Sequence, residues 1–176
     1  MPDAPGLELI AGELGDAHPG AVLTTYHEHG QGCLVVDPDR IADVLRFLRD
    51  TPGQEYTFLA SVHGADYLPA KPRFGVHYEL LSMARVERLR VRAALEDPGE
   101  GALPEIDSVV ELFPTASFQE REVYDFFGIV FRGHPDLRRI LMPETYVGWP
   151  QRRDFPVGGE PVIFTYDEHE VPRWFE

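Results

Sequence analysis

The sequence predicts an α+β fold in which a two-layer sandwich with a mixed sheet precedes one helix and a long extended arm. Apolar residues alternate strictly over residues 74–80 and 89–95, as in strands that bury one face of a sheet. Apolar residues recur at helical spacing over residues 7–14 and 41–48. The expected order is α-β-β-α-β-β-β, with helices on one sheet face. At 176 residues and 43% hydrophobic content, the chain can bury one core.

The first predicted element is a helix near the amino terminus. Gly15 is typical of a helix end, so we expect the helix to stop there. The apolar positions on its inner face are Leu7, Ile10, Ala11 and Leu14.

A β-hairpin is predicted next. Residues 21–27 and 33–37 are short runs rich in β-forming side chains, and the polar turn between them, residues 28–32, contains two glycines. Asp37 followed by Pro38 then indicates the start of a second helix, because Asp accepts backbone N–H groups there and Pro fits the first turn.

The second helix is expected to end near Asp50, before Pro52 and Gly53. A third strand is predicted over residues 56–62, ahead of the two alternating strands.

The last of these strands carries the one basic stripe of the first 114 residues. Arg88, Arg90 and Arg92 fall on the face opposite Leu89 and its apolar partners. We interpret the stripe as a solvated face paired with Glu79 and its neighbours; a docking surface is the alternative.

A further helix of about three turns is predicted from Ala116 to Phe127. Thr115 or Ser117 can cap it, and Glu120 stands three residues after Ser117, in the capping-box relation. Gly128 is a natural residue just past its end.

One face of this helix mixes charge with aromatic rings. Phe118, Glu122 and Phe126 are spaced one turn apart. A carboxylate between two phenylalanines is expected either to be partly buried with a bound donor or to lie at the edge of a contact.

We divide the chain into a platform over residues 1–114, a helix and loop over residues 115–142, and an arm over residues 143–176. Proline recurs too often in the arm for a long helix or a central strand, and aromatic residues are too frequent for a free linker. An arm that lies on another subunit meets both conditions. The alternative is an arm wrapped over its own domain.

Charge divides the chain in the same way. Residues 115–156 carry six acidic and six basic residues, so the net charge of -14 lies outside them. Arginine and aromatic residues together are typical of protein-facing surfaces. The overall charge argues against nucleic acid as a ligand, since phosphates require clustered Lys and Arg. The first residues have no basic segment of a signal peptide, and no run approaches the roughly 20 apolar residues of a membrane span.

The segment from Thr115 to Pro156 resembles the signature of the 30 kDa subunit of respiratory complex I, which is the C subunit of bacterial NADH:quinone oxidoreductase. The match covers about 40 of the 176 residues and combines charged, aromatic and glycine types over one unbroken stretch. Its first part includes Glu120, Arg121, Glu122, Asp125, Phe126, Phe127, His134, Arg138, Ile140 and Leu141, and its second runs from Pro143 to Gly148 and from Arg152 to Pro156.

The resemblance implies a structural subunit of the peripheral arm, on the cytoplasmic side of the bacterial plasma membrane. It implies no cofactor in this chain, with FMN, iron-sulfur clusters and quinone on partner subunits. The implied partners are the 49 kDa-type subunit and neighbouring iron-sulfur subunits. We expect contacts with a partner from Glu120, Arg121, Glu122, Asp125, Phe126, Phe127, His134, Arg138, Arg139, Tyr146, Trp149, Arg152, Arg153, Asp154 and Phe155, with the charged side chains orienting it and Tyr146, Trp149 and Phe155 as anchors.

Two alternatives to this function are retained. The same segment is shared by a subunit of membrane-bound hydrogenases or other quinone-type oxidoreductases. A free-standing metal enzyme is more remote: Glu122, Asp125 and His134 could form a ligand set, although nearby arginines compete with a cation. Cys33 is expected to be a buried structural thiol, and one cysteine cannot hold an iron-sulfur cluster.

Overall fold

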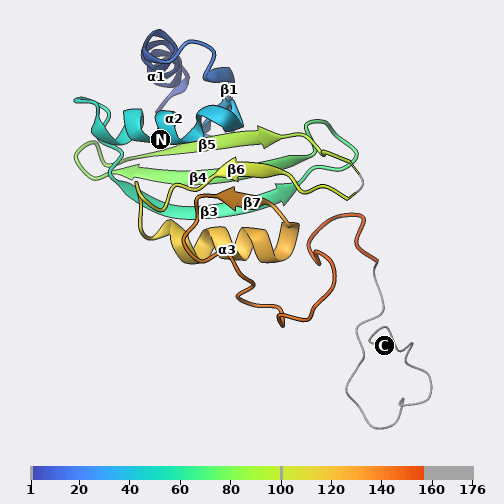
Figure 1. Ribbon diagram of the computed structural model, residues 1–176. Coiled ribbons are helices and arrows are strands. Elements are labelled where there is room, and N and C mark those ends of the chain that lie inside the picture. Colours follow the sequence, from blue (N-terminus) through green and yellow to red (C-terminus); the bar gives the residue numbers. More distant parts are fainter. Residues whose placement is uncertain (1, 100, 157–176) are drawn as a thin grey trace, which may run out of the picture.

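The computed structural model describes residues 2–99 and 101–156. Its elements, in chain order, are α1 (Ala4–Ala17), β1 (Val22–Glu28), β2 (Gln31–Val36), the 3-10 turn η1 (Pro38–Arg40), α2 (Ile41–Asp50), β3 (Phe58–Asp66), β4 (Phe74–Ser82), β5 (Glu87–Leu95), β6 (Glu105–Asp107), α3 (Ala116–Phe127) and β7 (Val130–Arg132). Figure 1 shows α1 and α2 toward the β1 edge of the main sheet and α3 along the opposite edge, beside β3. The predicted α+β class and order are confirmed, and residues 133–156 contain no helix or strand.

The main sheet is mixed, with strand order β1-β2-β5-β4-β3. Only the β2–β5 pair is parallel; the other three pairs are antiparallel. The chain crosses from β2 through α2 to β3 at the far edge and then returns through β4, so that β5 lies beside β2 and runs parallel to it. A second, two-stranded parallel sheet joins β6 to β7.

The core lies on one face of the main sheet. The alternating residues of β4 and β5 are buried on that face as predicted, with Tyr78 opposite Val91 and Val76 opposite Ala93. The buried face of α2 packs in the same cluster, together with residues of β6, β7 and α3. The core side chains from the predicted helical faces are Leu7, Ile10, Leu14, Ile41, Val44, Leu45 and Leu48.

Several predicted ends are wrong by a few residues. Helix α1 begins after Asp3, whose side chain accepts a hydrogen bond from the Gly6 amide, and it passes through Gly15 to end at Ala17. Gly15 lies inside the helix and does not end it. A Cβ at this position would meet nothing within 4 Å, so the packing does not require glycine there. Strand β3 begins at Phe58 rather than at residue 56, because Tyr56 turns its ring into the core.

The bounds of α3 were predicted correctly, but the capping box was not. Gly128 takes the left-handed conformation at the helix end, with φ of 68°. At the start, Thr115 makes no side-chain cap and Ser117 lies within the first turn. Glu120 is instead turned into the protein, so it does not reach back to the helix start.

The short strands β6 and β7 were not predicted. Three-residue strands are too short for alternation to show in sequence. They bury Ile106 and Phe131 and fix the position of α3, which precedes β7 by two residues. Within residues 2–99 and 101–156, no helix is both long and apolar enough to cross a bilayer.

Candidate docking surface

Helix α3 packs along the edge strand β3. The Gln119 side chain accepts a hydrogen bond from the Val62 amide, which occupies part of the free edge of that strand. A Cβ on Gly64 would lie 2.6 Å from the Phe127 ring, so the close approach of helix and strand requires glycine there. The inner side of α3 is thereby set against the sheet, and its outer side carries Phe118 and Glu122.

Glu120 is the signature residue that holds α3 from within. Its carboxylate is 0% exposed, and it accepts hydrogen bonds from Ser108 Oγ at 2.6 Å and from the Val109 amide at 2.8 Å. Burial raises the pKa of Glu120 to about 7, and the two hydrogen bonds only partly oppose this rise. The side chain therefore links α3 to the loop after β6.

Asp125 organises the loop that follows β7. Its Oδ2 accepts the amides of Ile140, Leu141 and Met142 at 3.0, 2.7 and 2.8 Å. Its Oδ1 accepts Arg139 Nη1 at 2.7 Å. Burial by itself would raise the pKa of Asp125, but these donors outweigh it and hold the pKa below its usual range. The carboxylate is thus a fully bonded anion on which residues 139–142 are folded.

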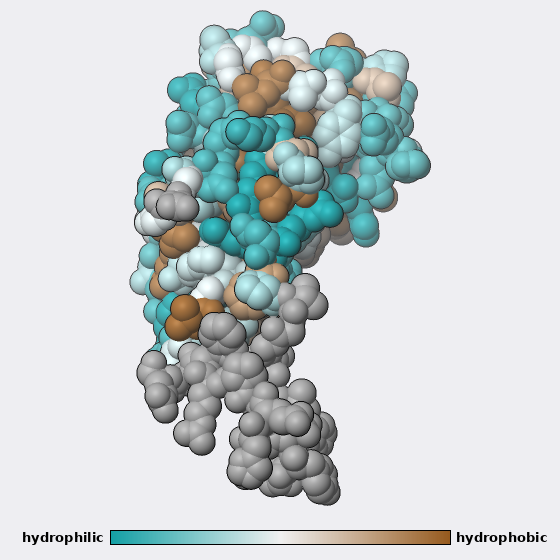
Figure 2. All heavy atoms as spheres, turned by 90° about the vertical axis from the view of Figure 1, so that its right-hand side faces the viewer, coloured by the Kyte–Doolittle hydropathy of each residue, from teal (hydrophilic) through white to brown (hydrophobic). Residues whose placement is uncertain are grey.

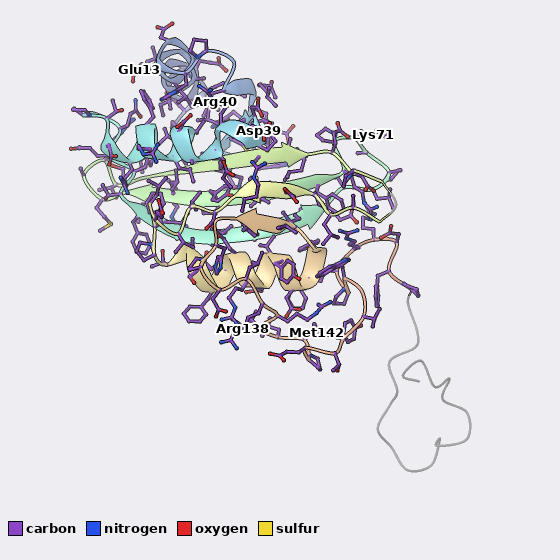
Figure 3. The ribbon with its side chains drawn as sticks, in the orientation of Figure 1. Glu13, Asp39, Arg40, Lys71, Arg138 and Met142 are labelled. Atoms are coloured by element: carbon purple, nitrogen blue, oxygen red, sulfur yellow. The ribbon has the colours of Figure 1, made fainter. Side chains whose placement is uncertain are left out.

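Arg121 ties the same loop to the helix from outside. Its guanidinium donates to the carbonyl oxygens of Arg138 and Arg139, both at 3.1 Å. The Arg138 side chain is 60% exposed and pairs with Asp136 at 3.0 Å. Figure 3 places Arg138 and Met142 on the surface of this loop below α3.

His134 joins the loop to the start of α3. Its Nε2 lies 3.0 Å from the Ser117 carbonyl oxygen, and its Nδ1 lies 3.0 Å from the Asp136 amide nitrogen. A carbonyl on one side and an N–H on the other fix the neutral tautomer, with Nε2 as donor and Nδ1 as acceptor. Both ring nitrogens are therefore occupied within the chain.

The metal-ligand set considered from sequence is not assembled. The Asp125 carboxylate already accepts hydrogen bonds from N–H donors, and both ring nitrogens of His134 are hydrogen-bonded within the chain. Glu122 lies on the exposed side of α3. In the described part of the chain, no three His, Cys, Asp or Glu side chains are grouped to hold a metal ion.

Residues 143–156, the described part of the predicted arm, lie on the chain's own domain. Residues 157–176 of that arm lie outside the described residues, so its predicted contact with another subunit stays a prediction. Trp149 stacks edge-on against Tyr124 with centroids 5.2 Å apart, and Arg139 lies over its ring at 4.6 Å. Trp149 also covers Gly128, where a Cβ would lie 2.6 Å from ring atom Cδ2. Glycine is therefore required at position 128 for two reasons: its left-handed backbone conformation and the close approach of the Trp149 ring.

The end of this segment is held by charge. Arg152 Nε donates to the Phe127 carbonyl oxygen at 2.7 Å. Arg73, which is 8% exposed, pairs with Asp66 at 2.9 Å and with Asp154 at 2.7 Å. The sequence reasoning missed Arg73 and Asp66, since both stand outside the signature and nothing local distinguishes them from surface charges.

Two further aromatic residues complete the segment. Tyr146 and Phe155 stack with centroids 6.3 Å apart, and Phe155 lies so close to Gly148 that a Cβ there would be 2.7 Å from its ring. Gly148 has φ of 100°, so a side chain is disfavoured there on both counts. Tyr146 and Phe155 are partly exposed, as anchors at a contact would be.

What remains outward is a mixed apolar and charged surface. Phe118 is 66% exposed and Leu141 is 59% exposed, and Glu122, on the same helix, is also exposed. We call Phe118, Glu122, Arg138 and Leu141 the helix-loop surface. The predicted partner contacts of Glu122 and Arg138 stay predictions, as do those of the other signature residues, and the structure adds Phe118 and Leu141 as exposed neighbours. Glu120 and Asp125 are fully buried, so their carboxylates act inside the chain.

Exposed apolar side chains also occur away from the helix-loop surface, for example Met83 at 68% and Phe58 at 50% exposed. The view turned by 90° is mainly hydrophilic, with separate small apolar patches (Figure 2).

Comparison with known proteins identifies the family. Residues 34–161 match the family model described as the 30 Kd subunit of respiratory-chain NADH dehydrogenase. The chain belongs to this family.

Relatives of the 30 kDa family support this identification. The C subunit of NADH-quinone oxidoreductase from Roseiflexus castenholzii is 43% identical over 162 residues, covering 92% of this chain and 91% of that protein. The corresponding protein of Herpetosiphon aurantiacus is 48% identical over 141 residues, 80% of each chain. The resemblance predicted from the signature is confirmed, and the relatives are subunits of an enzyme complex.

The 30 kDa family fold also occurs in a solved complex. A chain in the structure of the membrane-bound sulfane sulfur reductase, an archaeal respiratory membrane complex, matches with a TM-score of 0.69. The match covers 94% of this chain and 97% of that chain at 21% identity, so it shows a shared fold.

Proposed function

We propose that this chain is a cofactor-free structural subunit of the peripheral arm of a proton-pumping NADH:quinone oxidoreductase. It docks to the 49 kDa-type quinone-site subunit on the cytoplasmic side of the bacterial plasma membrane. FMN, the iron-sulfur clusters and quinone belong to partner subunits, and the reacting groups with them. Membership of the 30 kDa family supports the assignment to the complex.

The docking role is supported by one observation: some charged signature side chains bind groups of their own chain, whereas others point outward. Asp125, Glu120 and Arg121 bind backbone groups of their own chain and so hold α3 and residues 138–142 in one arrangement. Glu122 on the outer side of α3 makes no ion pair within the described residues. Internal charges therefore preorganise an outward surface, which lowers the entropic cost of docking.

The composition of the helix-loop surface favours a protein partner. An exposed phenylalanine and leucine beside an arginine and a glutamate match the apolar core and charged rim of protein interfaces. The Arg121 guanidinium lies 5.8 Å from the centre of the Phe118 ring, which limits the motion of both side chains. Electron transfer and quinone access depend on geometry, so a rigid scaffold can be essential without a catalytic residue.

The test is a pair of variants in the assembled complex. Phe118→Ala should weaken association with the 49 kDa-type subunit by about 10- to 30-fold, as expected for an interface anchor. The isolated chain should keep its melting temperature, because the ring is mostly exposed. Leu9→Ala is the matched control, since Leu9 is 69% exposed on the unrelated helix α1. Equal association of both variants and the unchanged protein, measured by co-purification and titration, would contradict the docking role.

A further inference from the structure

The face of the main sheet opposite the core is built from polar residues. Arg90 and Arg92 on β5 stand on it, and Arg90 pairs with Glu79 of β4, as predicted for this stripe. His77 is also on this face and stacks on His63 with centroids 5.0 Å apart. Within the described residues the helices α1 and α2 pack on the core side, so only the loop after β3 covers part of this face.

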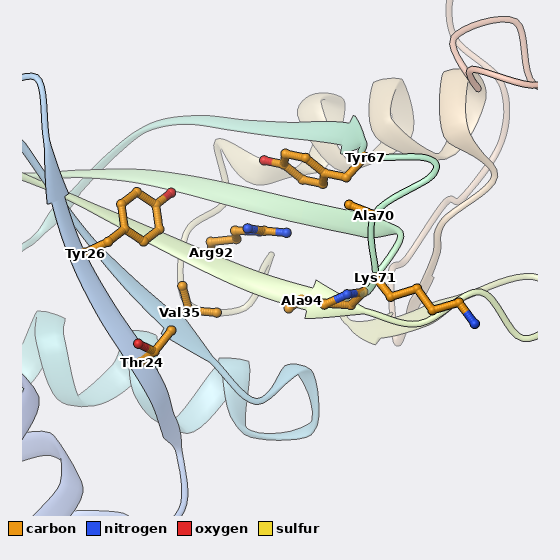
Figure 4. Close-up of a pocket in the computed structure, with 9 residues that line it drawn as sticks. Thr24, Tyr26, Val35, Tyr67, Ala70, Lys71, Arg92 and Ala94 are labelled. Carbon is orange, nitrogen blue, oxygen red and sulfur yellow. The ribbon is translucent and has the colours of Figure 1, made fainter.

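That loop and the sheet form a pocket of about 320 Å³. Tyr26 and Thr24 of β1 line one side, Val35 of β2 lies at the base, and Tyr67 and Lys71 line the other side. Figure 4 shows the Arg92 side chain between Tyr26 and Tyr67, while the Lys71 side chain extends away from it. The centre of the pocket is therefore the Arg92 guanidinium.

Arg92 differs from the arginines around it. Arg90 binds Glu79, and Arg73 binds Asp66, Asp97 and Asp154. In the part of the chain that the structure describes, Arg92 has no carboxylate within 4.0 Å, and its buried Nε has no hydrogen-bond partner. This occurs in a chain with a net charge of -14. A buried donor without a partner is costly, so such a group indicates a missing acceptor.

The neighbours of Arg92 hold it in place without neutralising it. The guanidinium carbon lies 4.1 Å from the centre of the Tyr67 ring, and Tyr67 Oη is 2.8 Å from His77 Nε2. Gly75 lies beneath, where a Cβ would be 3.0 Å from Arg92 Nε. Burial lowers the pKa of His77 to about 3, helped by His63 and the nearby arginines, so this imidazole is neutral at pH 7. The pocket thus presents one oriented cation among aromatic and aliphatic walls.

We propose that a glutamate or aspartate side chain of a neighbouring subunit enters this pocket and pairs with Arg92. Charge complementarity identifies the occupant, because a planar guanidinium binds carboxylates through paired hydrogen bonds. Thr24 and Tyr26 line one side of the pocket beside this guanidinium. Within the described residues no helix packs on this sheet face, which suits a polypeptide segment lying across it. The proposal rests on the assembly role above and adds a second contact, distant from the helix-loop surface.

Photocross-linking in the complex purified from native membranes tests the contact. A benzophenone amino acid replaces Tyr26, and the same amino acid replaces His27 as the control. Because side chains alternate along β1, residue 27 points to the other side of the strand. We expect the Tyr26 position to cross-link to a partner segment that contains Asp or Glu. A cross-link to a segment without an acidic side chain, to residues 157–176 of the same chain, or to nothing overturns the proposal.

A charge-removal pair tests the ion pair itself. Arg92→Gln should weaken association with the partner about 10- to 30-fold, whereas Arg88→Gln, on the same face of β5 but exposed, should change it less than about 2-fold. The melting temperature of the isolated full chain should fall only slightly, since Arg92 makes no ion pair within the described residues and loses only its contact with the Tyr67 ring. Equal association of the two variants overturns the proposal.

Two outcomes separate this inference from its alternatives. If Arg92→Gln assembles normally while Phe118→Ala does not, the carboxylate contact is wrong and the docking role stands. If the isolated chain binds free acetate or phosphate at Arg92, read from NMR shifts of the pocket amides, and Tyr26 gives no cross-link, the pocket is a small-anion site and the proposal fails.

Discussion

Arg139 Nη1 lies 2.7 Å from Asp125 Oδ1 in an ion pair whose carboxylate is 0% exposed and whose guanidinium side chain is 11% exposed. The same arginine donates to the Gly148 carbonyl oxygen at 2.8 Å and lies over the Trp149 ring at 4.6 Å. One side chain therefore joins helix α3, the loop after β7 and the segment of residues 143–156. The signature charges act first on their own chain, and the docking surface depends on them.

Replacement of Asp125 should be strongly destabilising. Asp125→Asn removes the charge opposite Arg139 and replaces an oxygen that accepts three amides, so we expect a loss of roughly 3–5 kcal/mol in the free energy of unfolding, as for other broken buried pairs. Asp136→Asn is the control, because its pair with Arg138 is more than half exposed and should cost less than about 1 kcal/mol. Urea denaturation measures both. Similar losses in the two variants would contradict the role of Asp125.

Glu120 should make stability depend on pH. Its pKa is about 7 in the folded chain and about 4.5 unfolded, so between these values the folded chain binds more protons. Stability from this group is therefore full below pH 4.5 and falls by roughly 3 kcal/mol as the pH rises to 7. Glu120→Gln should remove this fall, because the amide resembles the protonated acid. Denaturation from pH 4.5 to 8 measures the effect, and Glu122→Gln, exposed on the same helix, is the control for introducing an amide into α3.

Gly128 should tolerate no side chain. Gly128→Ala places a Cβ within 2.6 Å of Trp149 and adds strain at φ of 68°. Gly133→Ala isolates the strain, since its φ is 79° and a Cβ there meets nothing within 4 Å. We expect a cost of about 1–2 kcal/mol at Gly133 and clearly more at Gly128. Tryptophan fluorescence should change only in the Gly128 variant, and an unchanged spectrum would show that Trp149 does not pack there.

Reversal of Arg152 and of Arg153 should have different effects. Arg152 binds the Phe127 carbonyl oxygen and lies over the Phe74 ring at 4.9 Å, so Arg152→Glu should release the segment from the domain and raise its susceptibility to protease. The Arg153 amide is bound to Asp66 at 2.9 Å while its side chain is exposed. Arg153→Glu should therefore keep the fold and reduce assembly with the 49 kDa-type subunit. Normal assembly of that variant, measured by co-purification, would argue against a partner contact there.

Much of the fold could be predicted because the deciding patterns are local. Alternation over residues 74–80 and 89–95 reports which side chains share a face, and helical spacing does the same for Leu7 and Leu14. Element ends were less certain. Gly15 was expected to end α1. A helix tolerates glycine in its interior when the flanking residues remain helical, and α1 ends only at Ala17.

The sequence by itself determined the family, the α+β class and the segment where the signature lies, because these follow from residue types and short-range spacing. Only the tertiary structure decided which signature residues face outward. Glu120 and Asp125 are carboxylic acids that could not be distinguished in sequence from Glu122, yet they are buried against amides 11 to 17 residues away in the chain. A carboxylate is buried only where the folded backbone brings enough donors to replace water, and that depends on how the loops return to the helix.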